Sequence, residues 1–277
     1  MTDYLKKSDD YNNADVASVF DELSFWSSRF GALLFKHMEI RGRLRILDLG
    51  CATGFPLFEL AHVHGPSCQL TGIDVWKDAL ERARMKLKVY DLSNVQILEA
   101  DGARQPFPDS EFDLIVSNLG INNFADPEAV LSECWRVAKP GARIILTTNI
   151  KGHYKEFYEV FREILEASGR TESLEKLGAN EDHRGTKQQA CELLQRTGWS
   201  VGRIIEDSFE MRFLDGTALF NHSLTRFGFL GGWRSVVNTE DEEKVFGVIE
   251  EKLNAIARQN GGLRMTVPML YVEGEKS

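Results

Sequence analysis

The sequence lacks the features that mark membrane-spanning, secreted and metal-stapled proteins. No apolar run reaches the roughly 18 residues that a membrane-spanning helix needs. The first ten residues, MTDYLKKSDD, lack the apolar core of a signal peptide. The four cysteines lie far apart, with no pair at metal-ligand spacing. We therefore expect reduced thiols, a cytoplasmic location, no membrane span and no metal site.

Positive charge is also scarce. The 277 residues hold 33 lysines and arginines against 42 acids, a formal net charge of −9. Binding to nucleic acid without sequence preference needs a positive footprint, so the charge argues against a nucleic-acid partner. The hydrophobic content of 43% is enough for the core of one α/β domain with elaborations.

The most informative stretch begins with residues 45–49, RILDL, a short apolar run typical of a buried strand. Small residues follow at Gly50, Ala52 and Gly54, where the backbone can turn tightly and approach a ligand. Residues 56–61 then resume helical spacing. A strand, a small-residue turn and a helix together form the nucleotide-binding corner of a doubly wound sheet.

The spacing of this turn excludes two common nucleotide sites. The dinucleotide pattern G-x-G-x-x-G fails because its second and third glycines would be Ala52 and Phe55. The phosphate-binding pattern that ends in Gly-Lys-Ser/Thr is also absent. What remains is Asp48-x-Gly50-x-Ala52-x-Gly54. An acid before the turn suits a ligand that carries an ammonium group rather than phosphates.

Two further acids follow predicted strands. Asp74 ends the strand 69–74, twenty residues after Gly54, where a carboxylate accepts hydrogen bonds from a ribose diol. Asp101 follows the strand 95–99 and precedes Gly102. Fourth and fifth strands are predicted at residues 112–118 and 137–146, separated by a helix that starts near residues 126–127.

These motifs, in this order, resemble class I S-adenosylmethionine-dependent methyltransferases, above all the small-molecule group with the ubiquinone and menaquinone biosynthesis enzymes (methyltransferase type 11). The residues that carry the resemblance are Asp48 to Gly54, Gly72 to Asp74, Ala100 to Gly102, Pro106 to Pro108, Phe112 to Ile115 and Lys139 to Gly141. The resemblance is close over residues 40–150. It implies an α/β fold, a doubly wound Rossmann-like seven-stranded sheet whose last strand is antiparallel. N-terminal helices and a helical insertion between the last two strands complete the expected fold.

The resemblance also implies S-adenosyl-L-methionine as cofactor and S-adenosyl-L-homocysteine as product. The residues expected to contact the cofactor are Asp48, Gly50, Ala52, Gly54, Asp74, Asp101, Gly102 and Asn118. Two positions depart from the family. Ala52 replaces a glycine, and Asn122-Asn123 stands where the family often has paired histidines, so no base is carried over. The catalytic residues stay unassigned, with His153 and His222 as candidates for substrate contact.

One methyltransferase domain is expected over residues 1–277. Its parts are an N-terminal helical cap at 1–42, a cofactor-binding core at 43–150, and substrate-side helices, an insertion and a C-terminal hairpin at 151–277. The helices at 13–40 pack against the sheet edge, cover the cofactor, or do both, and Tyr11 is a candidate contact for the methionine end of the cofactor.

The pattern beyond the core predicts a helix at 154–165, a loop at 171–185, a helix at 186–197 and a strand that opens at 198–201 and runs to about residue 213. Pro268 lies in the last strand and implies a sheet edge or a bulge. The roughly fifty residues between the last two strands are rich in aromatic side chains. Phe213, Phe220, Phe227, Phe229 and Trp233 either form a local core or line an acceptor pocket.

The leading hypothesis is an enzyme that methylates an O, N or C atom of a small, apolar or aromatic molecule. The cofactor carries its own leaving group, so alignment matters most and a base is needed only when the acceptor must lose a proton. The alternative is a catalytically silent cofactor-binding module with a partner or regulatory role. Methylation of protein or nucleic acid is disfavoured by the net charge and the aromatic insertion.

Overall fold

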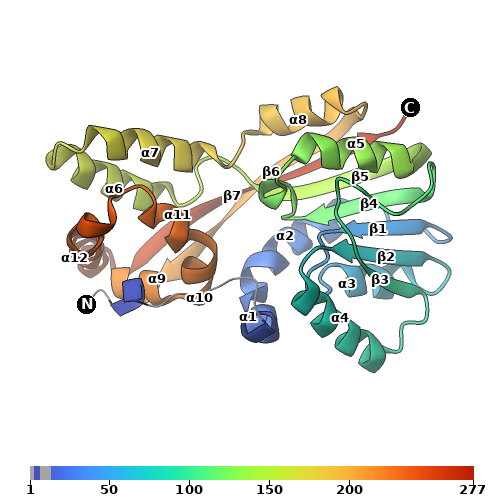
Figure 1. The fold of residues 1–277 in the computed structure, drawn as a ribbon, viewed down its shortest axis with the longest axis horizontal. Coiled ribbons are helices and arrows are strands. Elements are labelled where there is room, and N and C mark those ends of the chain that lie inside the picture. The colour runs from blue at the N-terminus through green and yellow to red at the C-terminus, as the bar shows by residue number, and fades with distance from the viewer. Residues whose placement is uncertain (1–2, 7–13) are drawn as a thin grey trace. The chain divides into compact units, whose positions relative to one another are not determined.

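The computed structural model describes residues 3–6 and 14–277 (Figure 1). The strands are β1 Arg45–Leu49, β2 Gln69–Asp74, β3 Val95–Glu99, β4 Phe112–Asn118, β5 Ala138–Asn149, β6 Ser200–Phe213 and β7 Leu263–Glu275. The helices are α1 Ala14–Val19, α2 Ser24–His37, α3 Leu57–His64, α4 Lys77–Tyr90, α5 Pro127–Val137, α6 Lys155–Ala167, α7 Thr171–Asp182, α8 Lys187–Arg196, α9 Gly216–Asn221, α10 Ser223–Thr225, α11 Gly231–Arg234 and α12 Glu242–Asn260. Shorter helical turns are η1 Asp3–Lys6, η2 Phe20–Leu23, η3 Ile121–Asn123, η4 Arg226–Leu230 and η5 Thr239–Asp241.

The strands form one sheet in the order β3-β2-β1-β4-β5-β7-β6, and the first five run parallel to one another. The order reverses beside β1, so β1 and β4 flank the point where ligands bind in open α/β sheets. The central strands are apolar and buried on both faces, as parallel strands between helical layers must be.

The last strand is antiparallel, as the resemblance implies. Backbone hydrogen bonds join Lys276 to Gly141 and Ala142 at the start of β5, and Ile150 just past its end donates to Pro268. Residue numbers therefore rise along β5 as they fall along β7. β6 forms the outer strand of the sheet, so β7 and β6 make the expected hairpin at one edge.

The chain divides into two compact units that interleave along the sequence. We call one the sheet unit; its described residues are 14–148, 186–206 and 269–277. We call the other the helical unit; its described residues are 3–6, 149–185 and 207–268. The division falls within β6 and β7. The consecutive parts expected from the sequence stay a prediction, since residues 186–206 and 269–277 group here with the sheet unit.

The helical unit has its own aromatic core. Phe157 of α6 stacks on Trp233 of α11 with ring centroids 3.9 Å apart, and Phe161 meets Phe246 of α12 at 5.7 Å. Phe220 of α9 lies between these groups and is fully buried. The insertion between β6 and β7 thus has its own packed core. From the sequence, its aromatic residues could have formed either a local core or the lining of a pocket.

One local prediction was wrong, and a second was wrong in one of its two alternatives. Residues 171–182 were expected to form a loop but form α7, which packs on α6. Leu177 of this helix is buried, and Glu172 and Lys176 form an ion pair on it. The helical spacing of these side chains favours a helix despite the helix-weakening Gly178, where an added Cβ would meet no atom within 4 Å. Pro268 was expected at a sheet edge or a bulge; the edge is incorrect, because β7 lies between β5 and β6, and the bulge stays a prediction. The Pro268 carbonyl accepts a hydrogen bond from the backbone N–H of Ile150, just past the end of β5.

Candidate cofactor site

The turn after β1 has the backbone conformation that its small residues allow. Gly50, Ala52 and Gly54 all have positive φ, at 79°, 42° and 105°. A side chain at Gly54 would begin 2.0 Å from the Phe58 ring of α3, so glycine is required there. Ala52 shows that a methyl group is accommodated at the position where the family has glycine, at the cost of a left-handed backbone.

Asp48 is a buried carboxylate directly before this turn. Its exposure is 0%, and neither side-chain oxygen has a hydrogen-bond partner of normal geometry within residues 3–6 and 14–277. Burial and then the charge of Asp74 raise the pKa of Asp48 to about 8, with only the backbone N–H of Leu57 acting in the opposite direction. A positively charged hydrogen-bond donor beside such a buried acid would supply the partner that its oxygens lack.

Asp74 ends β2 beside the same turn. Its Oδ2 accepts a hydrogen bond from the backbone N–H of Ala52 at 2.9 Å, and its Oδ1 accepts one from Trp76 at 2.8 Å. The two bonds fix the carboxylate against the turn and join the ends of β1 and β2. The structure therefore brings Asp48, the turn and Asp74 together, as the sequence predicts.

The remaining expected residues follow β3 and β4. Asp101 is exposed and accepts from the backbone N–H of Ala103 at 2.9 Å. A Cβ at Gly102 would lie 3.1 Å from Leu49, at the end of β1, so this segment approaches the same edge of the sheet. Asn118 ends β4 and is buried; its Oδ1 accepts from Thr147 Oγ1 at 2.7 Å, and its Nδ2 donates to the Ser27 carbonyl. All eight expected contacts thus lie in the sheet unit.

The N-terminal helices reach this site through residues that the sequence pattern does not single out. Asp21 accepts from Thr53 Oγ1 of the turn at 2.8 Å and pairs with Arg82 and Lys86 of α4. Burial raises the pKa of Asp21, but the hydrogen bonds from Lys86, Thr53 and Arg82 outweigh it and hold that pKa below its usual range. Asp21 is an ordinary acid in a helical segment, so only the fold reveals its role. Tyr11, suggested as a further contact, lies outside the described residues.

The two histidine candidates lie in the helical unit and differ in setting. His153 is buried and stacks on Tyr154, with ring centroids 4.1 Å apart, while Phe229 lies 4.7 Å away. Burial, and then Arg184, hold the pKa of His153 well below its usual range, so the ring is neutral. His222 is exposed and accepts from the backbone N–H of Leu224 through Nδ1, which makes it a helix cap. The assignment of either histidine to substrate contact remains a prediction.

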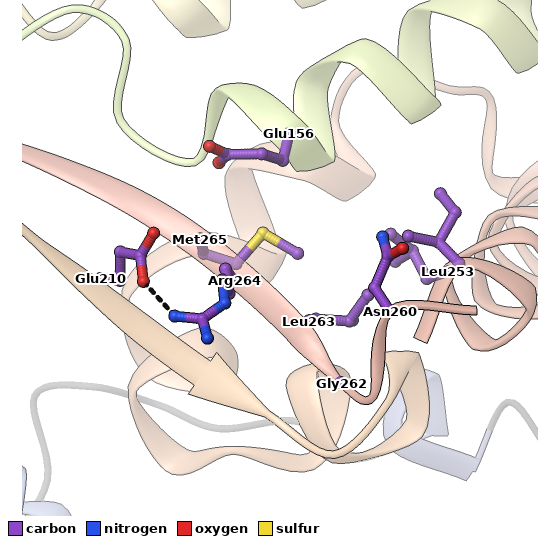
Figure 2. Close-up of a pocket in the computed structure, with 9 residues that line it drawn as sticks. Glu156, Glu210, Leu253, Asn260, Gly262, Leu263, Arg264 and Met265 are labelled. Carbon is purple, nitrogen blue, oxygen red and sulfur yellow. Dashed lines mark hydrogen bonds and ion pairs between the residues drawn. The ribbon is translucent and has the colours of Figure 1, made fainter. Parts of the chain in front are cut away.

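The helical unit also contains an open groove of about 310 Å³ between α12, α6 and the β6–β7 hairpin. Figure 2 shows Glu210 and Arg264 paired on the two strands, with Leu253, Leu263 and Met265 among the apolar side chains around them. Glu156 accepts a hydrogen bond from the backbone N–H of Thr266 at 2.9 Å. None of the residues expected to bind cofactor or substrate lines this groove.

The described residues include no group of three or more His, Cys, Asp or Glu side chains placed to hold a metal ion. Across the same residues, no helix is both long enough and apolar enough to cross a bilayer. All four cysteines are free thiols, and three of them are buried.

The strand order, the antiparallel last strand and the acid-flanked turn after β1 define the Rossmann-like methyltransferase fold. A family model described as a methyltransferase domain matches residues 40–198. The chain belongs to this family, the class I S-adenosylmethionine-dependent methyltransferases, as its sequence motifs indicate.

Individual relatives agree with this assignment. The demethylmenaquinone methyltransferase of Lactococcus lactis is 33% identical over 138 residues, which cover 50% of this chain and 53% of the relative. The chain thus matches about half of that relative's length. Among solved structures, the YcgJ protein from Bacillus subtilis gives a TM-score of 0.59 at 17% identity, covering 90% of this chain and 98% of that one. An S-adenosylmethionine-dependent methyltransferase from Aquifex aeolicus gives 0.55 at 22% identity, covering 70% and 92%. At these identities, the structures support the fold.

Proposed function

We propose that the chain is an enzyme that transfers a methyl group from S-adenosylmethionine to a small, apolar or aromatic molecule. The observation that carries the proposal is Asp48, a fully buried carboxylate beside the turn whose oxygens have no partner of normal geometry among the described residues. The ammonium group of the cofactor's methionine end supplies the cation that such an acid lacks. Family membership supports the same ligand.

In this proposal each part of the site has a separate task. Asp48 faces the ammonium group, Asp74 holds the ribose hydroxyls, and Asp101 with Gly102 meets the adenine edge. Asn118 is fixed by Thr147 and Ser27 at the end of β4. The bound cofactor supplies a methyl group on a sulfonium, together with its leaving group. The protein's contribution is then to align the acceptor and to keep water away from the transfer.

The acceptor class is the finer part of the proposal. The relatives are named for demethylmenaquinone, and the aromatic insertion of the helical unit suits an apolar acceptor. The net charge of −9 disfavours nucleic acid as the acceptor. We propose a cytoplasmic location because all four cysteines are free thiols.

The test combines binding with turnover. Calorimetry should show binding of S-adenosylmethionine and none of NAD; tight binding of NAD alone would overturn the assignment of the ligand. A panel of quinols, phenols, amines and demethylmenaquinone is then incubated with radiolabelled cofactor, and transfer to a small acceptor is expected. Cofactor binding without transfer to any acceptor in the panel would favour the catalytically silent module instead.

A further inference from the structure

The side chain of Tyr4, in the short helical turn η1, is buried in the helical unit. Tyr4 of η1 is fully buried, and its ring lies flat on Phe220 of α9, with centroids 4.6 Å apart and planes 7° from parallel. The other three residues of η1 are exposed or half-buried. Tyr4 is therefore the one fully buried side chain among residues 3–6.

The hydroxyl end of Tyr4 meets a buried acid. Glu250 of α12 is 1% exposed, and its Oε1 accepts a hydrogen bond from Thr217 Oγ1 at 2.5 Å. Its Oε2 and the Tyr4 hydroxyl are both buried and have no hydrogen-bond partner of normal geometry in the described part of the chain. Burial and then the charge of Glu250 raise the pKa of Tyr4, so the phenol stays protonated and can donate to the acid.

The surroundings of this site are built without η1. The backbone N–H of Gly216 donates to Asn254 Oδ1 at 2.8 Å, and a Cβ at Gly216 would lie 2.8 Å from that of Leu253, so α9 sits tightly against α12. Phe220 is also packed edge-on by Phe157 and Phe246. The Phe220 ring and the Glu250 carboxylate are thus held by contacts that do not involve Tyr4.

We propose that the space between Phe220 and Glu250 is a binding site for a phenol, and that Tyr4 is its internal ligand. An aromatic ring matches the floor, and one hydroxyl donor satisfies the second oxygen of the acid. A ligand that only accepts hydrogen bonds would leave that oxygen unsatisfied. Because Tyr4 is the buried side chain of η1, a free phenol in solution competes with it for the space and loosens the segment. This site does not depend on the methyl-transfer proposal.

The test opens the site by removing the internal ligand. Tyr4→Ala should lower the melting temperature, and p-cresol, which matches the tyrosine side chain, should raise it again. Calorimetry on the variant should give at least about tenfold tighter binding of p-cresol than of toluene, because toluene lacks the donor to Glu250. Adding Glu250→Gln should reduce this preference several-fold. The matched control is Leu5→Ala in the same segment, which should bind neither compound.

A second measurement avoids dependence on the folding of Tyr4→Ala. Tyr4→Phe keeps the ring and removes only the hydroxyl. Backbone amides of residues 3–6 should exchange faster in this variant than in the wild type, and p-cresol should increase exchange there in both proteins. Equal affinity for p-cresol and toluene would overturn the role of Glu250. No binding of p-cresol to Tyr4→Ala, or binding to wild type without release of residues 3–6, would leave Tyr4 as a packing residue and overturn the proposal.

Discussion

At the scale of single residues, Asp74 has a structural role in addition to the ribose contact proposed for it. It lies where a ribose anchor is expected, and it also holds the backbone of Ala52 and Trp76. Asp74→Ala should reduce affinity for S-adenosylmethionine ten- to hundredfold, because charge-assisted hydrogen bonds of about 1.5–3 kcal/mol are lost. Titration calorimetry measures this, with Glu81→Gln on the exposed part of α4 as control. Unchanged affinity in Asp74→Ala would place the ribose elsewhere.

The protonation of Asp48 gives a second prediction. Its pKa of about 8 in the folded chain lies above the value of about 4 in an unfolded chain, so the folded state holds the proton more tightly. The contribution of Asp48 to the free energy of unfolding is therefore greatest below about pH 4, falls as the pH rises to about 8, and is constant above that. The difference between wild type and Asp48→Asn, measured by denaturant unfolding across this range, should show that trend.

Ligand binding should reverse this protonation. A cationic group beside Asp48 favours its ionised form, so binding of S-adenosylmethionine near pH 6.5 should release close to one proton. Calorimetry in buffers with different heats of ionisation counts the protons released. Asp48→Asn keeps the shape of the side chain and should abolish the release. Equal proton release from wild type and variant would show that another group titrates.

At the scale of elements, the sequence predicts most pieces that have a local signal. α8 begins where Thr186 and Gln189 form a capping box, and α5 begins where Asp126 caps a helix with proline at its first position. α7 was not predicted because its two leucines give only a weak helical pattern among polar residues and a glycine, which are typical of a loop. The eight positions expected to contact the cofactor could be proposed because each lies at or just after the end of a strand in a short motif, whereas Asp21 has no such context.

The contact between Asp21 and Thr53 predicts how the N-terminal helices influence the cofactor. Thr53→Val keeps the side-chain volume and removes one buried hydrogen bond, while Arg82 and Lys86 still hold Asp21. We expect amides of residues 14–37 to exchange faster and S-adenosylmethionine to dissociate up to about fivefold faster, since one such bond contributes about 1 kcal/mol. Asp15→Asn, on the exposed face of α1, is the control. Dissociation at the wild-type rate would mean that these helices do not retain the cofactor.

At the scale of the whole molecule, the expected cofactor residues and the aromatic insertion fall in different units. The expected cofactor contacts all belong to the sheet unit, and the aromatic insertion belongs to the helical unit. The motifs of residues 45–118 are local and made the first unit predictable. The second depends on contacts between residues such as Phe157, Phe220 and Phe246, which are far apart in the sequence and acquire meaning only once packed.

Two phenylalanines of the insertion differ in burial and should therefore respond differently to substitution. Phe220 is fully buried, so Phe220→Ala should reduce the free energy of unfolding by about 3–5 kcal/mol. Phe227 is only half-buried, with Arg226 over its ring at 5.6 Å, so Phe227→Ala should change the melting temperature little. Neither belongs to the sheet unit, and both folded variants should bind S-adenosylmethionine within about twofold of wild type, a difference under about 0.5 kcal/mol.

Phe220→Ala and Phe227→Ala should differ in their preference among methyl acceptors. If the insertion selects the acceptor, Phe227→Ala alters the order of preference in a panel of phenols, quinols and amines, because an accessible ring can contact a substrate. Phe220→Ala should keep the wild-type order among the molecules that remain folded, since its ring supports the core. Cofactor affinity, melting temperature and acceptor preference measured on the same preparations distinguish these effects. An unchanged order in Phe227→Ala would remove that ring from the acceptor site, and a changed order in Phe220→Ala would mean that the aromatic core itself shapes the choice.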